Sequence, residues 1–93
     1  MTAQPEIVHD PRACRFETLV DGHHNELAYR LDAGVMVIWH TGVAPELQGR
    51  GIAAALVREA LAWAQAAGLK VEPRCSYVRA YMQRHPATAA LRA

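Results

Sequence analysis

The chain has 93 residues, of which 52% are hydrophobic and 20% charged, and its formal net charge is +1. This length allows one small domain, and the hydrophobic content excludes a disordered chain. Ten basic residues against nine acidic ones exclude a protein built mainly to grip long nucleic acid. We expect a single domain over residues 1–93, with a core at about 7–86 and a tail at 87–93.

Cysteine usage and the N-terminal segment indicate where such a chain works. Cys14 and Cys75 are too few for a disulfide framework, and no second pair completes a zinc site, so we expect no metal. Residues 1–6 lack the basic and apolar regions of a signal peptide, and no apolar run approaches the ~20 residues that span a bilayer. We expect a cytoplasmic monomer or weak homodimer without a membrane or nucleic-acid partner.

The first third of the chain predicts a three-stranded antiparallel meander. Residues 1–10 are expected to be a leader that pairs loosely at Ile7-Val8. The turn at Asp21-Gly22 separates the first two strands, and alternation in the second places Leu31 on its buried face. The third strand is apolar almost throughout, which predicts cover on both faces and Trp39 in the core. The strands are expected at 16–20, 26–31 and 35–41.

The second half predicts a strand-helix-strand crossover. From 51 to 67, apolar residues recur with the period of a helix. An alternating segment at 69–75 follows, with Pro73 at a position where no neighbour needs its N–H. This order implies a right-handed crossover and a parallel strand pair. A short second helix is expected from Tyr77 to about Arg84, with Ser76 as its cap. The tail at 87–93 should be frayed or loosely packed because it has no core pattern.

Two glycines lie between the third strand and the long helix, in Gln48-Gly49-Arg50-Gly51-Ile52-Ala53. The first N–H groups of a helix have no partner within it, and they lie at its partially positive end. Such a turn binds anions, phosphates above all, and glycine permits close approach of the backbone. The residues alone predict an anion site, with an ordinary strand-to-helix loop as the alternative.

This stretch resembles the Gln/Arg-x-x-Gly-x-Gly/Ala signature of the GNAT acetyltransferase superfamily, in its usual place between a buried strand and a helix. The flanking residues His40-Thr41-x-Val43-Ala44-Pro45, Pro73-x-Cys75-Ser76-Tyr77-Val78 and Arg84-x-Pro86 resemble its short, YjdJ-type branch. The resemblance covers roughly 7–86. It implies a small α/β (α+β) GNAT-like fold, in which the antiparallel three-stranded meander is extended by the right-handed crossover and a short C-terminal helix.

The resemblance also implies acetyl-CoA as the cofactor. Its pyrophosphate would rest on the backbone N–H groups from Gly49 to Ala53, where aligned amides already favour phosphate. Its pantetheine arm would pair with the strand before the turn, so the two parallel strands must splay apart. Arg84, with His85 beside it, either meets the cofactor's phosphates or adenine or is only a charge at the end of a helix. The expected cofactor-binding residues are Thr41, Gly42, Val43, Gln48, Gly49, Arg50, Gly51, Ile52, Ala53 and Arg84.

Three residues are candidates for the chemistry, and each has a plainer alternative. Cys75 precedes a helix, whose N-terminus favours a thiolate, so it is either a reactive or pocket-lining thiol near the acetyl group or a small buried hydrophobe. His40 either accepts a proton from an ammonium substrate or is structural. Tyr77 either protonates the departing thiolate, as a tyrosine in this region can in the superfamily, or packs.

We therefore expect an N-acetyltransferase that moves an acetyl group to an amine of a protein or small molecule by direct attack on the thioester. The alternative is an acyl-CoA-binding or protein-interaction module with little catalysis. The chain departs from larger GNAT enzymes, which build the wall of the acceptor site from helices between the first strands. The acceptor site should then be shallow or completed by a partner chain.

Overall fold

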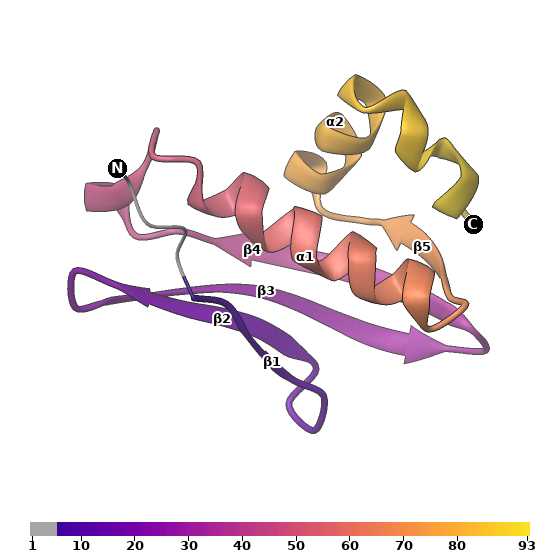
Figure 1. Ribbon diagram of the computed structural model, residues 1–93, viewed down its shortest axis with the longest axis horizontal. Coiled ribbons are helices and arrows are strands. Elements are labelled where there is room, and N and C mark those ends of the chain that lie inside the picture. The colour runs from indigo at the N-terminus through magenta and orange to yellow at the C-terminus, as the bar shows by residue number, and fades with distance from the viewer. Residues whose placement is uncertain (1–5) are drawn as a thin grey trace.

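A computed structural model describes residues 6–93 as a five-stranded sheet with both α-helices on one side (Figure 1). The sheet order is β1 (Val8–Asp10), β2 (Arg15–Val20), β3 (His23–Asp32), β4 (Val35–Gly42) and β5 (Lys70–Pro73). The helices are η1 (Pro45–Leu47), α1 (Ile52–Ala66), α2 (Ser76–Arg84) and η2 (Pro86–Leu91), where η denotes a 3-10 helix. The first four strands are antiparallel, and α1 connects β4 to its parallel neighbour β5.

The hydrophobic core lies between α1 and the sheet. One face of α1 is buried, and it packs against β-strand side chains that include Leu27, Met36 and Ile38, each of them inaccessible to solvent. Burying a side chain of this size contributes about 1.5–3 kcal/mol. The buried residues of α1 are Ile52, Ala55, Leu56, Val57, Ala60, Leu61 and Ala64. The helical periodicity expected over 51–67 is therefore the pattern that holds the crossover on the sheet.

The predicted fold class is confirmed, but the meander has four antiparallel strands rather than three. The leader contributes β1, which pairs with β2 so that His9 lies opposite Phe16. The two rings stack with centroids 4.0 Å apart, and His9 Nε2 lies 2.7 Å from the Tyr29 hydroxyl. This anchoring depends on residues far along the chain, so a short polar segment gave little sign of it. Residues 1–5 of the expected leader lie outside the described residues.

Two large apolar side chains expected in the core are exposed, Leu31 at 53% and Trp39 at 54%. Leu31 lies where β3 runs past the last pairing of β2, at Ala28, and so lacks a neighbour on that side. In β4, Ile38 pairs with Tyr29 but His40 pairs with Ala28, which leaves Trp39 as the extra residue of a β-bulge. The expectation of a central strand covered on both faces is therefore wrong for its last part.

The C-terminal tail was expected to be frayed or loosely packed; most of its residues are exposed, but it is not frayed, because it forms η2 and is bonded to β5. Arg92 forms a parallel bridge with Val71 of β5, and the Ala93 N–H donates to the Val71 carbonyl at 2.9 Å. The Lys70 ammonium group also donates to the carbonyl of Ala90 at 2.7 Å. An edge strand offers unpaired backbone groups, and here the tail takes them up.

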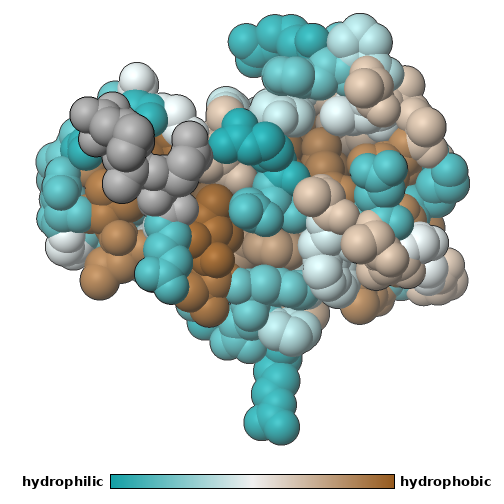
Figure 2. Space-filling view, viewed as in Figure 1, coloured by the Kyte–Doolittle hydropathy of each residue, from teal (hydrophilic) through white to brown (hydrophobic). Residues whose placement is uncertain are grey.

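The surface mixes polar and apolar residues. In the view of Figure 2, apolar patches are interrupted by hydrophilic side chains. Within residues 6–93 no helix combines the length and the apolar character needed to cross a membrane. The same residues contain no group of three or more His, Cys, Asp or Glu side chains arranged to hold a metal ion.

Candidate functional site

The glycine turn before α1 is made possible by two residues with left-handed backbone conformations. Gly49 has φ +84° and Gly51, the N-cap of α1, has φ +82°. Any other L-residue would pay about 1–2 kcal/mol there, because its Cβ crowds the following carbonyl. These two positions therefore explain why the sequence places glycines at this spacing, and they bring the chain sharply from η1 into the helix.

The start of α1 leaves several backbone N–H groups for an acceptor outside the helix. The Ala55 N–H donates to the Gly51 carbonyl at 3.0 Å and so begins the helical hydrogen bonds. The N–H groups of residues 52 to 54 come before Ala55, and the helix contains no carbonyl one turn earlier to accept their hydrogen bonds. The first turn of α1, all of it in the described part of the chain, carries no acidic side chain to take these donors. This end of the helix is suited to an anion.

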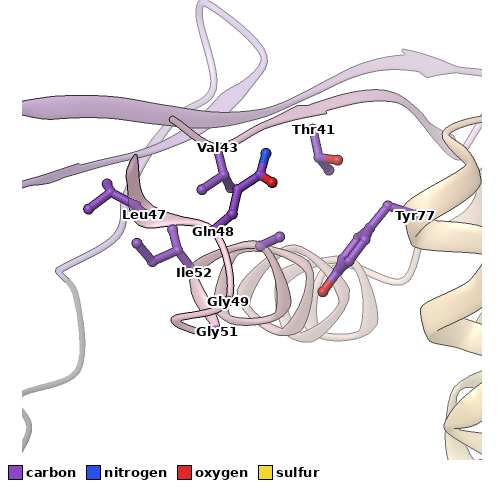
Figure 3. Close-up of a pocket in the computed structure, with 9 residues that line it drawn as sticks. Thr41, Val43, Leu47, Gln48, Gly49, Gly51, Ile52 and Tyr77 are labelled. Carbon is purple, nitrogen blue, oxygen red and sulfur yellow. The ribbon is translucent and has the colours of Figure 1, made fainter. Parts of the chain in front are cut away.

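A pocket of about 510 Å³ opens in front of this turn (Figure 3). In Figure 3, Tyr77 reaches from the start of α2 toward the turn, and Thr41 lies above it on β4. The lining combines apolar side chains with polar groups and bare backbone. Its residues are Thr41, Val43, Leu47, Gln48, Gly49, Gly51, Ile52, Ala53 and Tyr77.

The parallel strands β4 and β5 separate at one end of this pocket. Their register ends with Ile38 opposite Pro73. The N–H groups of Arg74 and Cys75 then both donate to the Ile38 carbonyl, at 2.9 and 3.1 Å, as the chain turns away into α2. β4 continues to Gly42, and no strand among residues 6–93 pairs with it on this side beyond Ile38. The two strands therefore stop pairing here, and we call the place where they part the gap between β4 and β5.

Cys75 lies at this gap, as the N-cap of α2. Its Sγ is 3.4 Å from the Thr41 hydroxyl. Burial raises the pKa of the Cys75 thiol, but hydrogen bonds from the Thr41 hydroxyl, from the backbone of Val78 and Tyr77 and from that of Thr41 outweigh it. The net result is a pKa below that of an ordinary thiol, because these groups stabilise the thiolate. The structure thus surrounds Cys75 with hydrogen-bond donors at the edge of the pocket.

His40 lies on the opposite face of the sheet from Thr41, although the two are neighbours in sequence. It pairs with Ala28, and its Nε2 is 3.8 Å from a carboxylate oxygen of Glu26. The same nitrogen would lie 3.0 Å from a Cβ placed on Gly42. His40 therefore faces away from the pocket, over the segment of β4 whose other face lines it.

Seven of the ten predicted cofactor residues line the pocket, together with Tyr77, whereas Gly42, Arg50 and Arg84 do not. Arg50 is turned toward the β2–β3 turn, where its Nη1 is 2.8 Å from an oxygen of Asp21. Arg84 is exposed near the end of α2, and its Nε donates to the Ala80 carbonyl at 3.5 Å. The predicted cluster is therefore a wall of backbone and neutral side chains rather than a basic pocket.

Two residues of the site were missed from the sequence. Leu47 in η1 lines the pocket and is only 2% exposed. Its apolar character between Pro45 and the glycine turn was the one available signal. Asn25 is fully buried in β3, and its Oδ1 accepts a hydrogen bond from the Ala44 N–H just ahead of η1. An asparagine shortly after Asp21-Gly22 reads as part of a turn, so nothing in the sequence indicated this contact.

Known proteins share this architecture. One is the solution structure of a "GCN5-like putative N-acetyltransferase" from Staphylococcus aureus, which matches with a TM-score of 0.77 and 24% identity. The match covers 99% of this chain and 91% of that one. At this identity the likeness shows the fold alone. A "putative acetyl transferase" from Pyrococcus furiosus is 26% identical with a TM-score of 0.53, over 76% of this chain and 56% of that one. No curated protein matches the sequence.

The comparison with family profiles is more specific. Residues 15–91 match the profile described as GCN5-related N-acetyl-transferase. This match spans most of the chain, from β2 through η2, and includes every residue that lines the pocket. The chain belongs to the GCN5-related N-acetyltransferase (GNAT) family.

Proposed function

We propose that this protein is an acetyl-CoA-dependent N-acetyltransferase that moves the acetyl group to an amine by direct attack on the thioester. One observation carries the proposal: in a chain of the GNAT family, a single pocket extends from the open N-terminus of α1 to Thr41, which lies on β4 beyond the last residue that pairs with β5. The first feature suits phosphate groups, and the second offers unpaired strand backbone to an extended arm.

The residues present fit this cosubstrate. The pyrophosphate would be held by the backbone N–H groups around Gly51 and Ile52, with no need for a charged side chain. The pantetheine arm would add to the free edge of β4 near Thr41, as a short extra strand. The apolar side chains of Val43 and Leu47 suit its methylene groups. Once bound, acetyl-CoA supplies the activated acetyl group.

The protein groups around the gap then serve the transfer. The neutral amine nitrogen forms a bond to the thioester carbonyl carbon, and the carbon–sulfur bond breaks. The nitrogen gives up one proton, and the departing sulfur takes one. The Tyr77 hydroxyl, which lines the pocket, is the candidate donor of the proton to the sulfur. Backbone N–H groups of β4 are candidates to polarise the carbonyl, and most of the rate enhancement would come from holding amine and thioester together.

A second route is favoured by the surroundings of Cys75. Hydrogen bonds to Sγ lower the pKa of this thiol, and a thiolate is the nucleophilic form. In this route Cys75 takes the acetyl group first, with release of free coenzyme A, and the amine then takes it from Cys75. Treatment with acetyl-CoA followed by mass spectrometry would find an acetylated Cys75 peptide that disappears when amine is added. Absence of that adduct during turnover leaves the direct route.

The main experiment is an NMR titration with acetyl-CoA, followed by an assay of free thiol release with a mixed panel of amines and peptides. We expect the amide signals of Gly49, Gly51 and Ile52 to shift and thiol release to depend on the amine. Absence of binding at millimolar acetyl-CoA would overturn the proposal. Binding without turnover above hydrolysis would favour an acyl-CoA-binding or protein-interaction module instead.

We also propose that residues 1–93 form one domain and that it works in the cytoplasm as a monomer or weak homodimer. The two cysteines of the described residues, Cys14 and Cys75, are both free, which suits a reducing compartment. Gel filtration with light scattering would test the oligomeric state.

A further inference from the structure

The face of the sheet opposite α1, on which the described residues place no helix, carries a group of charged side chains and histidines. We call this surface the helix-free face. The group comes from three adjacent strands, which align the side chains because Arg15 pairs with Ala28, Glu17 with Glu26, and Ala28 with His40. We call it the Glu26 cluster, and its members are Arg15, Glu17, His24, Glu26 and His40.

Glu26 lies at the centre of the cluster. One of its carboxylate oxygens is 3.8 Å from His24 Nδ1 and 4.0 Å from Arg15 Nη1, and the other is 3.8 Å from His40 Nε2. Glu17 lies 3.0 Å from Arg15 Nε and 3.4 Å from His24 Nε2. Two carboxylates thus share one guanidinium group, and with neutral imidazoles the cluster has one negative charge in excess. The long contacts of Glu26 leave it able to accept a further donor.

Trp39 adds an exposed aromatic ring that contacts the cluster through His40. It is the extra residue of the bulge in β4, it is 54% exposed, and its ring stacks on His40 with centroids 5.6 Å apart. The indole and the Glu26 carboxylate both lie near the His40 ring. Together they are a suitable setting for an alkyl ammonium ion, because a ring face attracts the cation and a carboxylate accepts its hydrogen bonds.

The cluster adjoins the gap between β4 and β5 from the side that the cofactor pocket leaves free. Thr41 points to the pocket and contacts Cys75, whereas His40 points to the helix-free face and its Nε2 lies over Gly42. Pairing with β5 has already ended at Ile38. The edge of β4 beyond Ile38 is therefore unpaired, and an amine on the helix-free face approaches the proposed thioester past this edge.

We propose that the Glu26 cluster is the acceptor site and that it takes a primary alkyl ammonium group. This rests on the proposed function. Glu26 receives the cation, Trp39 covers its alkyl chain, and His40 Nε2 takes one proton from the nitrogen. The lone pair that is freed forms the bond to the thioester carbonyl carbon, and the electrons of the carbon–sulfur bond leave with the coenzyme's sulfur. The nitrogen then loses a second proton, which balances the proton that this sulfur takes. A free amine and a lysine side chain share this chemistry.

A binding experiment tests the site without acetyl-CoA. The full chain is titrated with butylamine and, separately, with a short lysine peptide, and the side-chain NMR signals of its tryptophans and histidines are followed. We expect the Trp39 indole and the His40 ring to shift, while Trp63, on the other side of the sheet, stays as an internal reference. Glu26→Gln should abolish the shifts. Glu59→Gln makes the same change at an exposed position of α1 and should leave them.

Steady-state kinetics separate the roles of the two residues. Glu26→Gln should raise the KM for the amine about tenfold or more, because a charge-assisted hydrogen bond is lost. His40→Gln should lower kcat about a hundredfold, the lower end for a general base, with a smaller change in KM. Both variants should bind acetyl-CoA as the original does, as judged from the amide signals of Gly49 and Gly51.

The outcomes distinguish this inference from the proposed function. If acetyl-CoA binds and turns over but Glu26→Gln leaves the amine KM and the Trp39 signal unchanged, the acceptor site lies elsewhere and only this inference is overturned. If acetyl-CoA does not bind at all, the proposed function fails. A tighter response to the lysine peptide than to butylamine would assign the acceptor to polypeptides, and the reverse would assign it to free amines.

Discussion

The side-chain oxygen of Asn25 accepts a hydrogen bond of 2.8 Å from the backbone N–H of Ala44, and so connects β3 to the loop that follows β4. Asn25 is fully buried, and its amide nitrogen donates to the carbonyls of Thr18 and His23 at 3.4 and 3.3 Å. One side chain therefore satisfies backbone groups of three segments. The loop that it holds leads from Val43 into the wall of the pocket.

Replacing Asn25 with Leu should lower both stability and cofactor affinity. The Ala44 N–H would lose its buried acceptor, at a cost of about 1–3 kcal/mol in the free energy of unfolding. The released loop should also weaken acetyl-CoA binding. Urea denaturation and calorimetric titration measure the two effects. Thr18→Val removes a buried hydroxyl that bonds to Glu6 and not to this loop, so it should cost stability alone. Unchanged affinity in Asn25→Leu would mean that the loop is held without it.

The glycine turn can be tested with two substitutions that have the same backbone cost. Gly51 and Gly34 both have φ +82°, but Gly51 begins α1 whereas Gly34 lies in the turn at the other end of β4. Alanine at either position should lower the free energy of unfolding by about 1–2 kcal/mol. Only Gly51→Ala should weaken acetyl-CoA binding, because it distorts the amides that are proposed to hold the phosphates. Equal losses of affinity in the two variants would count against a phosphate site at the turn.

The pKa of Cys75 should depend on Thr41. In a Cys14→Ser background, the rate of iodoacetamide alkylation as a function of pH reports the thiolate of Cys75 alone. Thr41→Val removes the hydroxyl that bonds to Sγ and should move the midpoint of this curve to higher pH, since the thiolate loses a donor. Thr88→Val, near the far end of α2, should leave the midpoint in place. An unchanged midpoint in Thr41→Val would show that the backbone donors alone lower the pKa of Cys75.

Stability should fall in mild acid because of His9. Burial lowers the pKa of this imidazole, and the nearby Asp10 opposes the effect only in part. The unfolded chain therefore takes up the His9 proton first, below a pH of about 6.5, and the free energy of unfolding decreases as the pH drops from there toward the folded pKa. His9→Gln should remove this part of the slope between pH 8 and pH 5 in urea denaturation. Parallel slopes would contradict the assignment.

The parts of the fold that could be predicted are those that depend on residues close together in the sequence. Helical periodicity identifies α1, and the glycine spacing identifies the turn, because Gly49 and Gly51 hold conformations that other residues avoid. The crossover then follows from the order of the elements and the handedness of such connections. These signals need no knowledge of distant contacts, and they place the pocket and most of its lining.

The remaining features depend on where distant segments meet. Thr41 and Cys75 are 34 positions apart, and their contact arises only because β5 stops pairing at Ile38. β1 is held in place because His9 contacts the rings of Phe16 in β2 and Tyr29 in β3. The sequence of a three-residue strand does not indicate these contacts. The bulge at Trp39 likewise has no signal in the sequence, since an unbroken apolar run predicts a regular buried strand.

That bulge also determines which side of the sheet the side chains of His40 and Thr41 face. Because side chains of a strand alternate, the single unmatched residue at Trp39 decides that His40 faces one side of the sheet and Thr41 the other. A regular strand of the same length would instead place the imidazole in the pocket and the Thr41 hydroxyl outside it. Deleting Trp39 would leave both side chains on their present faces, because Ile38 and His40 would then be neighbours opposite the neighbouring residues Tyr29 and Ala28. The extra residue is thus compatible with the pocket only because the strand bulges around it.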